Sequence, residues 1–271
     1  MEKLTKIFFT DIDETLVTTD KRLTDGNRKA IEDFLAWGNV LAISTGRALA
    51  GAIRLTKSLG LYGSPNTYIS AFNGGQIYDT CHEKTLYKRA LNQDQIRFIN
   101  QCAREYGIHL QGYTDTSVLA EHDNDNLQKY CRIQNLPSKI VPDLGEALES
   151  SCKLLGVDFF HPENVTGFRS YLKERVHGDM DIFLSNDWLL EIVASGVNKG
   201  AALRFLADYL RIPVEHTISA GDQENDLPMI RAAGVGCAMK NAVPMLKDVS
   251  DYITENDNNH DGIAEILGRF A

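Results

Sequence analysis

The sequence predicts an α/β protein built on a parallel sheet, with a smaller α+β segment inserted into it. Apolar strand-like runs alternate with helical runs over about the first 80 residues, which is the pattern of a parallel sheet. Residues 84–187 follow a different pattern, with short strands around one helix, and the first pattern returns from Leu189 onward. We therefore expect a core in two parts, residues 1–83 and 188–271, separated by an inserted domain over residues 84–187.

The elements expected in the first part of the core alternate along the chain. They are strands over 5–11, 39–43 and 67–71, and helices over 25–37 and 47–59. In the insert we expect strands over 85–88, 109–113 and 117–120, with a helix over 93–106. In the second part of the core we expect a helix over 199–210, a helix after Asp222, and short strands near Val235 and Tyr252.

The first strand ends in two carboxylates, Asp11 and Asp13. Aspartate is disfavoured within strands and costly to bury ionised without a partner, so both residues are expected where the strand stops. Alternation along a strand sends both side chains to one side. Two close carboxylates repel each other unless a cation neutralises them, and oxygen ligands suit a hard divalent ion. An Asx-type turn or a helix cap is the alternative interpretation of this pair.

Two further strand ends carry polar side chains. The apolar run 39–43 ends in Ser44, Thr45, Gly46 and Arg47, whose hydroxyl and guanidinium groups suit a phosphate. The run 216–220 leads into a second acidic cluster over residues 221–228. In open α/β sheets the ligand lies outside the carboxyl ends of the strands, so we expect these three termini to converge on one anion and metal site.

The motifs at these strand ends resemble those of the haloacid dehalogenase superfamily of phosphohydrolases, and in particular its Cof-like branch of sugar-phosphate phosphatases. Four motifs match in order and span residues 11–226: Asp11-x-Asp13-x-Thr15, Thr45-Gly46-Arg47, Lys199, and Gly221-Asp222-x-x-Asn225-Asp226. The run Phe72-Asn73-Gly74-Gly75 is a further family-like element. One departure is Glu14, where the family usually has glycine, and it adds a negative charge near the anion site.

The resemblance implies a Rossmann-like parallel-sheet core with helices on both faces, plus an inserted α/β (α+β) cap domain. It implies a magnesium ion held by Asp11, Asp222 and the main-chain carbonyl of Asp13. Asp11 would then be the nucleophile and Asp13 the general acid and base. Phosphate or substrate contacts would come from Thr45, Gly46, Arg47, Asn73, Lys199 and Asn225. The spacing alone supports a metal, carboxylate and anion site, and does not say which aspartate attacks.

Each of these residues also has an ordinary structural interpretation. Thr45 and Asn225 could cap helices, and Lys199 could be a solvated residue in the first turn of a helix. A cation at a helix N-terminus opposes the helix dipole, and a phosphate would be a reason for it to be there. In isolation, Arg47 is typical of a surface residue and Asn73 of a turn. Their assignment to substrate binding therefore depends on the resemblance.

Composition agrees with an enzyme that acts on small molecules. The chain has 271 residues, 43% of them hydrophobic and 24% charged, which is enough to bury a sizeable core. A net charge of −9 argues against a nucleic-acid or anionic-membrane surface. The five cysteines are odd in number and lack Cys-x-x-Cys spacing, so reduced thiols are expected. The N-terminus enters a strand at once and not a signal peptide, so we expect a cytoplasmic protein.

Three functional hypotheses follow from the sequence. The favoured one is a magnesium-dependent phosphatase that hydrolyses small phosphorylated metabolites, sugar phosphates foremost, through an aspartyl phosphate. The second is a phosphomutase or phosphotransferase that uses the same aspartyl phosphate and excludes water. The third is a non-catalytic sensor of a phosphate ligand, in which Glu14 has disabled the site. The sequence does not distinguish between substrates and does not indicate the oligomeric state.

Overall fold

The computed structural model describes residues 5–176 and 178–271. Within them the chain forms two compact units. The core unit comprises residues 5–47, 52–87 and 198–271, and the insert unit comprises residues 48–51 and 88–197. No helix in these described stretches combines the length and apolar character needed to cross a bilayer.

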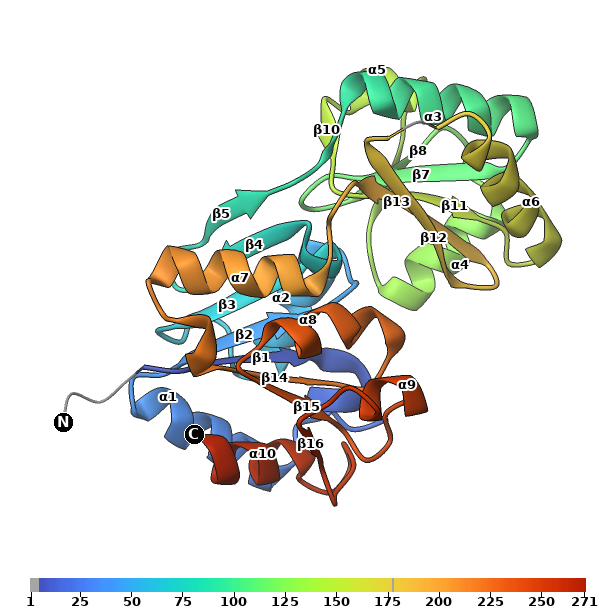
Figure 1. Ribbon diagram of the computed structural model, residues 1–271. Helices are drawn as coiled ribbons and strands as arrows, with labels where there is room; N and C mark the ends of the chain where they lie inside the picture. Colours follow the sequence, from blue (N-terminus) through green and yellow to red (C-terminus); the bar gives the residue numbers. More distant parts are fainter. Residues whose placement is uncertain (1–4, 177) are drawn as a thin grey trace. The chain divides into compact units, whose positions relative to one another are not determined.

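The core unit is built on an eight-stranded sheet with the order β16-β15-β14-β1-β2-β3-β4-β5 (Figure 1). Its strands are β1 (Ile7–Asp11), β2 (Val40–Ser44), β3 (Thr67–Ala71), β4 (Gln76–Asp79), β5 (Lys84–Lys88), β14 (Thr217–Gly221), β15 (Val235–Ala238) and β16 (Tyr252–Ile253). The strands from β16 to β3 pair in parallel, and β4 is antiparallel to β3.

The parallel part of this sheet reverses its strand order at its centre. The strands β1, β2 and β3 follow one another outward in one direction, and β14, β15 and β16 do so in the other. The reversal lies between β1 and β14, which pair from Ile7 with Thr217 to Thr10 with Ala220. This is the order of a doubly wound α/β fold, in which ligands bind beyond the carboxyl ends of the strands at the reversal point. Asp11 and Gly221 are the last residues of these two strands.

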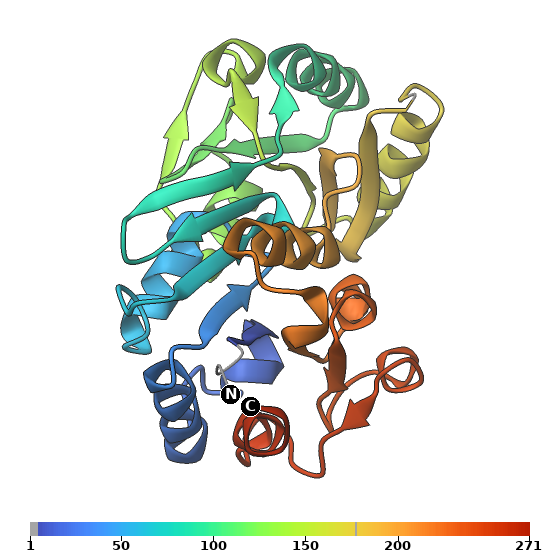
Figure 2. The same cartoon turned by 60° about the vertical axis from the view of Figure 1, so that its left-hand side comes forward.

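Helices cover both faces of the core sheet, as Figures 1 and 2 both show. The apolar side chains of α1 (Asp25–Ala36) and α10 (Gly262–Phe270) pack with Phe8 on one face. Those of α7 (Lys199–Leu210) and α8 (Leu227–Ala232) pack with Phe9 on the other. Because β1 is buried on both faces, its residues form a continuous apolar run up to Thr10. The remaining core helices are α2 (Leu49–Ser58) and α9 (Pro244–Lys247).

The insert unit contains a six-stranded sheet with the order β12-β13-β11-β7-β8-β9. The elements of this unit are β6 (Leu91–Asn92), α3 (Gln93–Tyr106), β7 (His109–Tyr113), β8 (Val118–Ala120), α4 (Asp125–Gln134), β9 (Ser138–Ile140), α5 (Leu144–Ala147), β10 (Ser150–Ser151), β11 (Leu154–Val157), α6 (Pro162–Lys173), β12 (Met180–Asn186) and β13 (Leu189–Ala194). Ile96 of α3 and Phe168 of α6 belong to one buried apolar cluster with Leu154 of β11. Strands β6 and β10 form a separate antiparallel pair.

The predicted α/β class, with a parallel-rich sheet and helices, is confirmed. Two strands pair differently from what the sequence suggested. Strand β5 joins the core sheet, although its residues were grouped with the insert, and β13 joins the insert sheet, although residues from Leu189 were grouped with the core. The predicted boundaries at residues 84 and 188 therefore precede the changes of unit at residues 88 and 198. Alternation in a sequence identifies a strand, but it carries no information on the partner strand.

Candidate active site

Asp11 lies at the end of β1, at the point where the strand order reverses. Asp11 is only 8% exposed, so its carboxylate has little contact with solvent. The chain leaves β1 through a wide π-type turn, Ile12–Leu16, in which Glu14 has a left-handed backbone with φ 59° and ψ 14°. The turn brings the buried Thr15 beneath the second acidic cluster, where its Oγ1 donates a 2.7 Å hydrogen bond to Asp222 Oδ1. Residues 207 positions apart in the sequence are thereby joined.

Lys199 is the first residue of α7 and is completely buried. Asn198 caps the helix by accepting a hydrogen bond from the amide of Ala201, so Lys199 is not needed for capping. Its Nζ donates to Asp11 Oδ1 and to Asp226 Oδ1, each at 2.5 Å. Although burial opposes the charged form, these two carboxylates raise the pKa of Lys199 well above its usual value. Their negative charge offsets both the cost of burying the ammonium group and its repulsion by the N-terminal end of the helix dipole.

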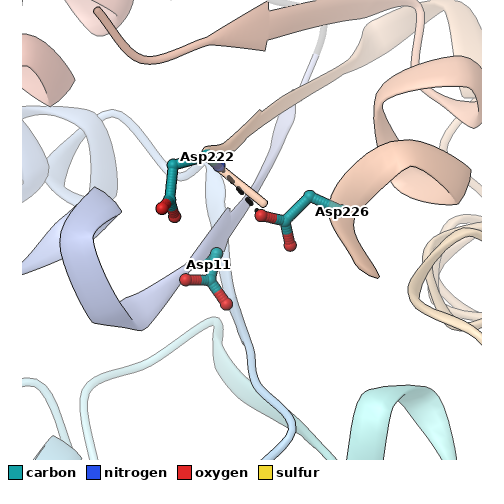
Figure 3. A group of neighbouring side chains, drawn as sticks. All are labelled: Asp11, Asp222 and Asp226. Atoms are coloured by element: carbon teal, nitrogen blue, oxygen red, sulfur yellow. Dashed lines mark hydrogen bonds between the residues drawn. The ribbon is translucent and has the colours of Figure 1, made fainter. Parts of the chain in front are cut away.

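Asp222 and Asp226 follow the end of β14. Asp226 Oδ2 accepts hydrogen bonds from the backbone amides of Asp222 and Gln223, at 2.9 and 3.0 Å, and the first of these bonds is drawn in Figure 3. Glycine is required just before them, because a Cβ on Gly221 would lie 2.5 Å from the Asp226 Cβ. With Oδ1 on Lys199 and Oδ2 on two amides, Asp226 has protein donors at both oxygens. Its side chain therefore orients its neighbours.

The side chains of Asp11, Asp222 and Asp226 form one carboxylate cluster (Figure 3). They offer ligand oxygens that all lie within 4.8 Å of one another. Burial is the main cause that raises the pKa of Asp11 to about 8 and that of Asp222 to about 6. Three buried carboxylates share a single lysine, so the cluster carries more negative charge than its neighbours balance. An all-oxygen donor set with excess negative charge fits a hard divalent cation.

A second loop approaches this cluster from the end of β2. Thr45 is buried, and its Oγ1 accepts the amide of Arg47 at 3.2 Å. The backbone carbonyl of Thr45 accepts the amide of Asn73 at 2.9 Å, and Asn73 Oδ1 accepts Asn225 Nδ2 at 3.1 Å. Asn73 has φ 55°, and a Cβ on Gly46 would lie 3.1 Å from its Oδ1. The missing side chain of Gly46 therefore allows Asn73 to connect the loops after β2 and β14.

The Asp13 side chain lies outside the carboxylate cluster and binds two cations. Arg47 donates to it in bidentate fashion, from Nε to Oδ2 at 2.9 Å and from Nη2 to Oδ1 at 2.8 Å. Lys21 Nζ lies 3.0 Å from the same Oδ1. Burial would raise the pKa of Asp13, but the hydrogen bonds and charges of Arg47 and Lys21 outweigh it and lower the pKa. In this arrangement Asp13 is ionised.

The hydrogen bonds described above join eight of the nine residues predicted for the site in two separate networks, one through Asp226 and one through Arg47 and Asn73, and Gly46 lies against Asn73. The nine predicted residues are Asp11, Asp13, Thr45, Gly46, Arg47, Asn73, Lys199, Asp222 and Asn225. In the side-chain cluster, the third carboxylate is Asp226 and not Asp13. Sequence reasoning missed Lys21, which no motif indicates. It gave no role to Thr15, although Thr15 belongs to the first motif.

Comparisons with known proteins extend over almost the whole chain. The family model for haloacid dehalogenase-like hydrolases matches residues 8–267. A haloacid dehalogenase-like hydrolase from Bacteroides thetaiotaomicron is 27% identical, with a TM-score of 0.89 over 98% of this chain and 100% of that one. A Thermotoga maritima structure is 28% identical, with a TM-score of 0.89 over 99% and 98% of the two chains.

Among curated proteins, 5-amino-6-(5-phospho-D-ribitylamino)uracil phosphatase YitU from Bacillus subtilis is 27% identical, and the alignment covers 100% of this chain and 99% of that protein. The resemblance inferred from the four motifs is therefore confirmed. The chain is a hydrolase that belongs to the haloacid dehalogenase-like family.

Proposed function

We propose that this protein is a magnesium-dependent phosphatase that hydrolyses small phosphorylated metabolites, sugar phosphates foremost, through an aspartyl phosphate on Asp11. The observation that carries the proposal is the buried carboxylate cluster at the strand reversal point, with Lys199 bound between Asp11 and Asp226. A phosphate monoester is among the slowest of biological groups to hydrolyse, because a dianion repels its nucleophile. A site for this reaction must therefore combine a carboxylate nucleophile with fixed positive charge.

The side chains of Asp11 and Asp222, with the main-chain carbonyl of Asp13, would hold the magnesium ion. When bound, Mg²⁺ supplies positive charge that offsets the repulsion between the Asp11 carboxylate and a phosphoryl group. Thr15 orients the Asp222 carboxylate by its 2.7 Å hydrogen bond, and Asp226 orients the loop that carries Asp222 through its amides. Such supporting contacts set the affinity of a metal site as much as the ligands do.

In the first step an Asp11 oxygen attacks phosphorus, and the bond between phosphorus and the ester oxygen breaks. Asp13 donates its proton to the departing alkoxide. In the second step Asp13, now ionised, accepts a proton from water, whose oxygen attacks phosphorus and releases Asp11 and inorganic phosphate. Dividing one difficult displacement into two steps is the advantage of covalent catalysis. Lys199 and Thr45 would bind the non-bridging oxygens throughout.

Asp13 can carry a proton only when its ion pair with Arg47 is loosened. A phosphate offers Arg47 a competing bidentate acceptor of the same geometry as a carboxylate. We therefore assign Arg47 to the substrate and expect it to leave Asp13 when the substrate binds. Asn73 and Asn225 would line the same anion site, where Gly46 leaves room for the Asn73 side chain.

The substrate is expected to be a hexose or pentose phosphate, recognised through the inserted segment 84–187 acting as a cap. The name of the Bacillus subtilis relative adds 5-amino-6-(5-phospho-D-ribitylamino)uracil to the compounds worth testing. That compound joins a sugar-like phosphate to a ring, so it falls within the same chemical class. The net charge of −9 makes nucleic acid an unsuitable partner.

The test is a phosphate-release screen against several dozen phosphorylated metabolites, with Mg²⁺ and with a chelator. Wild-type protein should release phosphate only with the metal, and Asp11→Asn should lose at least about 10³-fold of that activity. Asp20→Asn is a matched control, because the Asp20 side chain is highly exposed and pairs with the equally exposed Arg22.

Three outcomes would contradict the proposal. Full activity in Asp11→Asn would remove Asp11 as nucleophile. Isomerised sugar phosphate without free phosphate would favour a phosphomutase or phosphotransferase. Tight binding with no turnover across the whole panel would favour a phosphate-ligand sensor.

A further inference from the structure

Two residues beside the active site have left-handed backbones without being glycine, and their side chains meet. Glu14 and Lys21 both have φ 59°. For residues with a side chain this conformation costs free energy, so interactions of the side chains must offset it. Lys21 Nζ lies 3.4 Å from Glu14 Oε1 and 3.0 Å from Asp13 Oδ1. Lys21 therefore bridges the two carboxylates that follow β1.

The backbone brings Lys21 to this position through a tight turn. The amide of Thr18 donates to the carbonyl of Arg22, and the amide of Lys21 donates to the carbonyl of Thr18, both at 2.8 Å. This turn folds the chain back toward Asp13, although Lys21 is eight positions further along the sequence.

Glu14 is held from several sides. Its Oε2 accepts Thr19 Oγ1 at 2.9 Å and Asn258 Nδ2 at 3.2 Å, and its backbone carbonyl accepts Asn241 Nδ2 at 2.7 Å. Asn258 is buried and also donates to the carbonyl of Val17 at 3.0 Å. These hydrogen bonds hold the Glu14 side chain in place, and its carboxylate in turn anchors the Lys21 ammonium group by an ion pair.

Folding alone gives little reason for Lys21 to contact Asp13. The side chains are 42% and 36% exposed, and an ion pair exposed to this extent contributes little to stability. Arg47 already binds both oxygens of the same carboxylate. A second cation becomes necessary only when Arg47 is occupied elsewhere, which is what phosphate binding does in the function proposed above.

We propose that Lys21, anchored by Glu14, is a positioning residue that holds the ionised Asp13 carboxylate in place to accept the proton of water in the second step, while Arg47 is engaged by the phosphate. This inference rests on the proposed phosphatase function and adds two residues to its working site. Lys21 acts through Asp13, and its contribution lies in the orientation of that side chain.

The first test is the kinetics of Lys21→Met with a substrate found in the screen. We expect kcat to fall about fivefold to tenfold, the equivalent of one ordinary hydrogen bond lost at a partly exposed site, with KM changed less than about twofold. Lys21→Arg should recover at least half of the lost kcat. The melting temperature should stay the same, which separates positioning from a structural role. Arg22→Met is the matched control in the same turn, because the Arg22 side chain is highly exposed, and its kcat should equal that of wild type.

The second test removes the anchor. Glu14→Gly relieves the left-handed backbone but releases Lys21, so kcat should fall about twofold to threefold while the melting temperature is unchanged or higher. In the Lys21→Met background, Glu14→Gly should lower kcat no further, because both changes remove the same interaction. Additive losses in the double variant would overturn the role of Glu14 as the anchor of Lys21.

The third test does not depend on turnover. In crystals of Arg47→Met the Asp13 carboxyl should keep its position on Lys21, and in Arg47→Met/Lys21→Met it should lose that position. An unmoved Asp13 in the double variant would overturn the proposal. If wild type hydrolyses no ester, the proposed function fails and these crystals alone decide about Lys21. If wild type is active and Lys21→Met equals it in kcat and KM, the positioning role fails and the phosphatase stands.

Discussion

Replacing Lys199 by methionine should destabilise the core unit strongly. Lys199 is completely buried, and its Nζ lies 2.5 Å from both Asp11 Oδ1 and Asp226 Oδ1. Methionine fills most of the same volume, so the change removes the charge and leaves little cavity. Removing one partner of a buried ion pair leaves an uncompensated charge and costs about 3–5 kcal/mol. We expect the free energy of unfolding to fall by about that amount at pH 7.5 in a chelator.

The effect should depend on pH with a definite sign. Without Lys199, the pKa of Asp11, which burial already raises to about 8, rises further above its unfolded value of 3.8. A carboxyl whose folded pKa is raised stabilises the fold at low pH, and this stability is lost as the pH rises through the folded pKa. The part of the difference between wild type and Lys199→Met that depends on Asp11 should therefore be constant up to about pH 8 and grow above it, where Asp11 ionises in wild type but not yet in the variant.

The assay is urea unfolding followed by tryptophan fluorescence and circular dichroism. The chain has two tryptophans, Trp37 in the core unit and Trp188 in the insert unit. A Trp188→Phe background therefore makes Trp37 the reporter of the core. Lys29→Met is the matched control, because Lys29 is highly exposed and pairs with Asp33 one helical turn away, a contact that contributes little to stability. A loss below about 1 kcal/mol in Lys199→Met, or one equal to this control, would refute the reasoning.

Three further predictions concern the metal site. The pKa of Asp222 is raised to about 6 and that of Asp11 to about 8, so protons compete with Mg²⁺ for these carboxylates. The apparent affinity for Mg²⁺ should therefore increase from pH 5 to pH 8, and Mg²⁺ binding at pH 7 should release protons in calorimetric titrations. An affinity that is independent of pH would contradict this prediction. Thr15→Val removes the 2.7 Å hydrogen bond to Asp222 and should raise the Mg²⁺ concentration for half-maximal activity about tenfold. An unchanged Mg²⁺ concentration for half-maximal activity would contradict this prediction. In Asp226→Asn the side-chain NH₂ group must face either Lys199 Nζ or the two backbone amides, all of which are hydrogen-bond donors. We expect kcat in steady-state assays to fall about tenfold to a hundredfold. Wild-type kinetics in this variant would show that Asp226 is not needed.

Much of the fold could be predicted because its signals are local. A buried parallel strand is a short apolar run, and an apolar run that ends in charged or hydroxyl side chains marks the edge where a strand stops. Strand β1 and helix α7 were recognised in this way, within a few residues of their observed bounds. The strand ends could be expected to meet because parallel strands share one carboxyl edge, so residues after β1, β2 and β14 lie near one another, whereas the roles of the individual residues came from the family resemblance.

Local patterns thus predict most of the core elements and the edge of the sheet where polar side chains follow the strands, but of the four helices described in the insert they predict only α3. Which of these polar groups bind one another depends on the tertiary fold. Lys199 meets Asp11 across 188 positions, Arg47 meets Asp13 across 34, and strand β13 pairs within the insert sheet. Periodicity depends on neighbours along the chain, whereas these pairings depend on strand order and on turns such as the one that brings Lys21 to Asp13. For that reason no local pattern could show that Asp13 is held ionised by two cations.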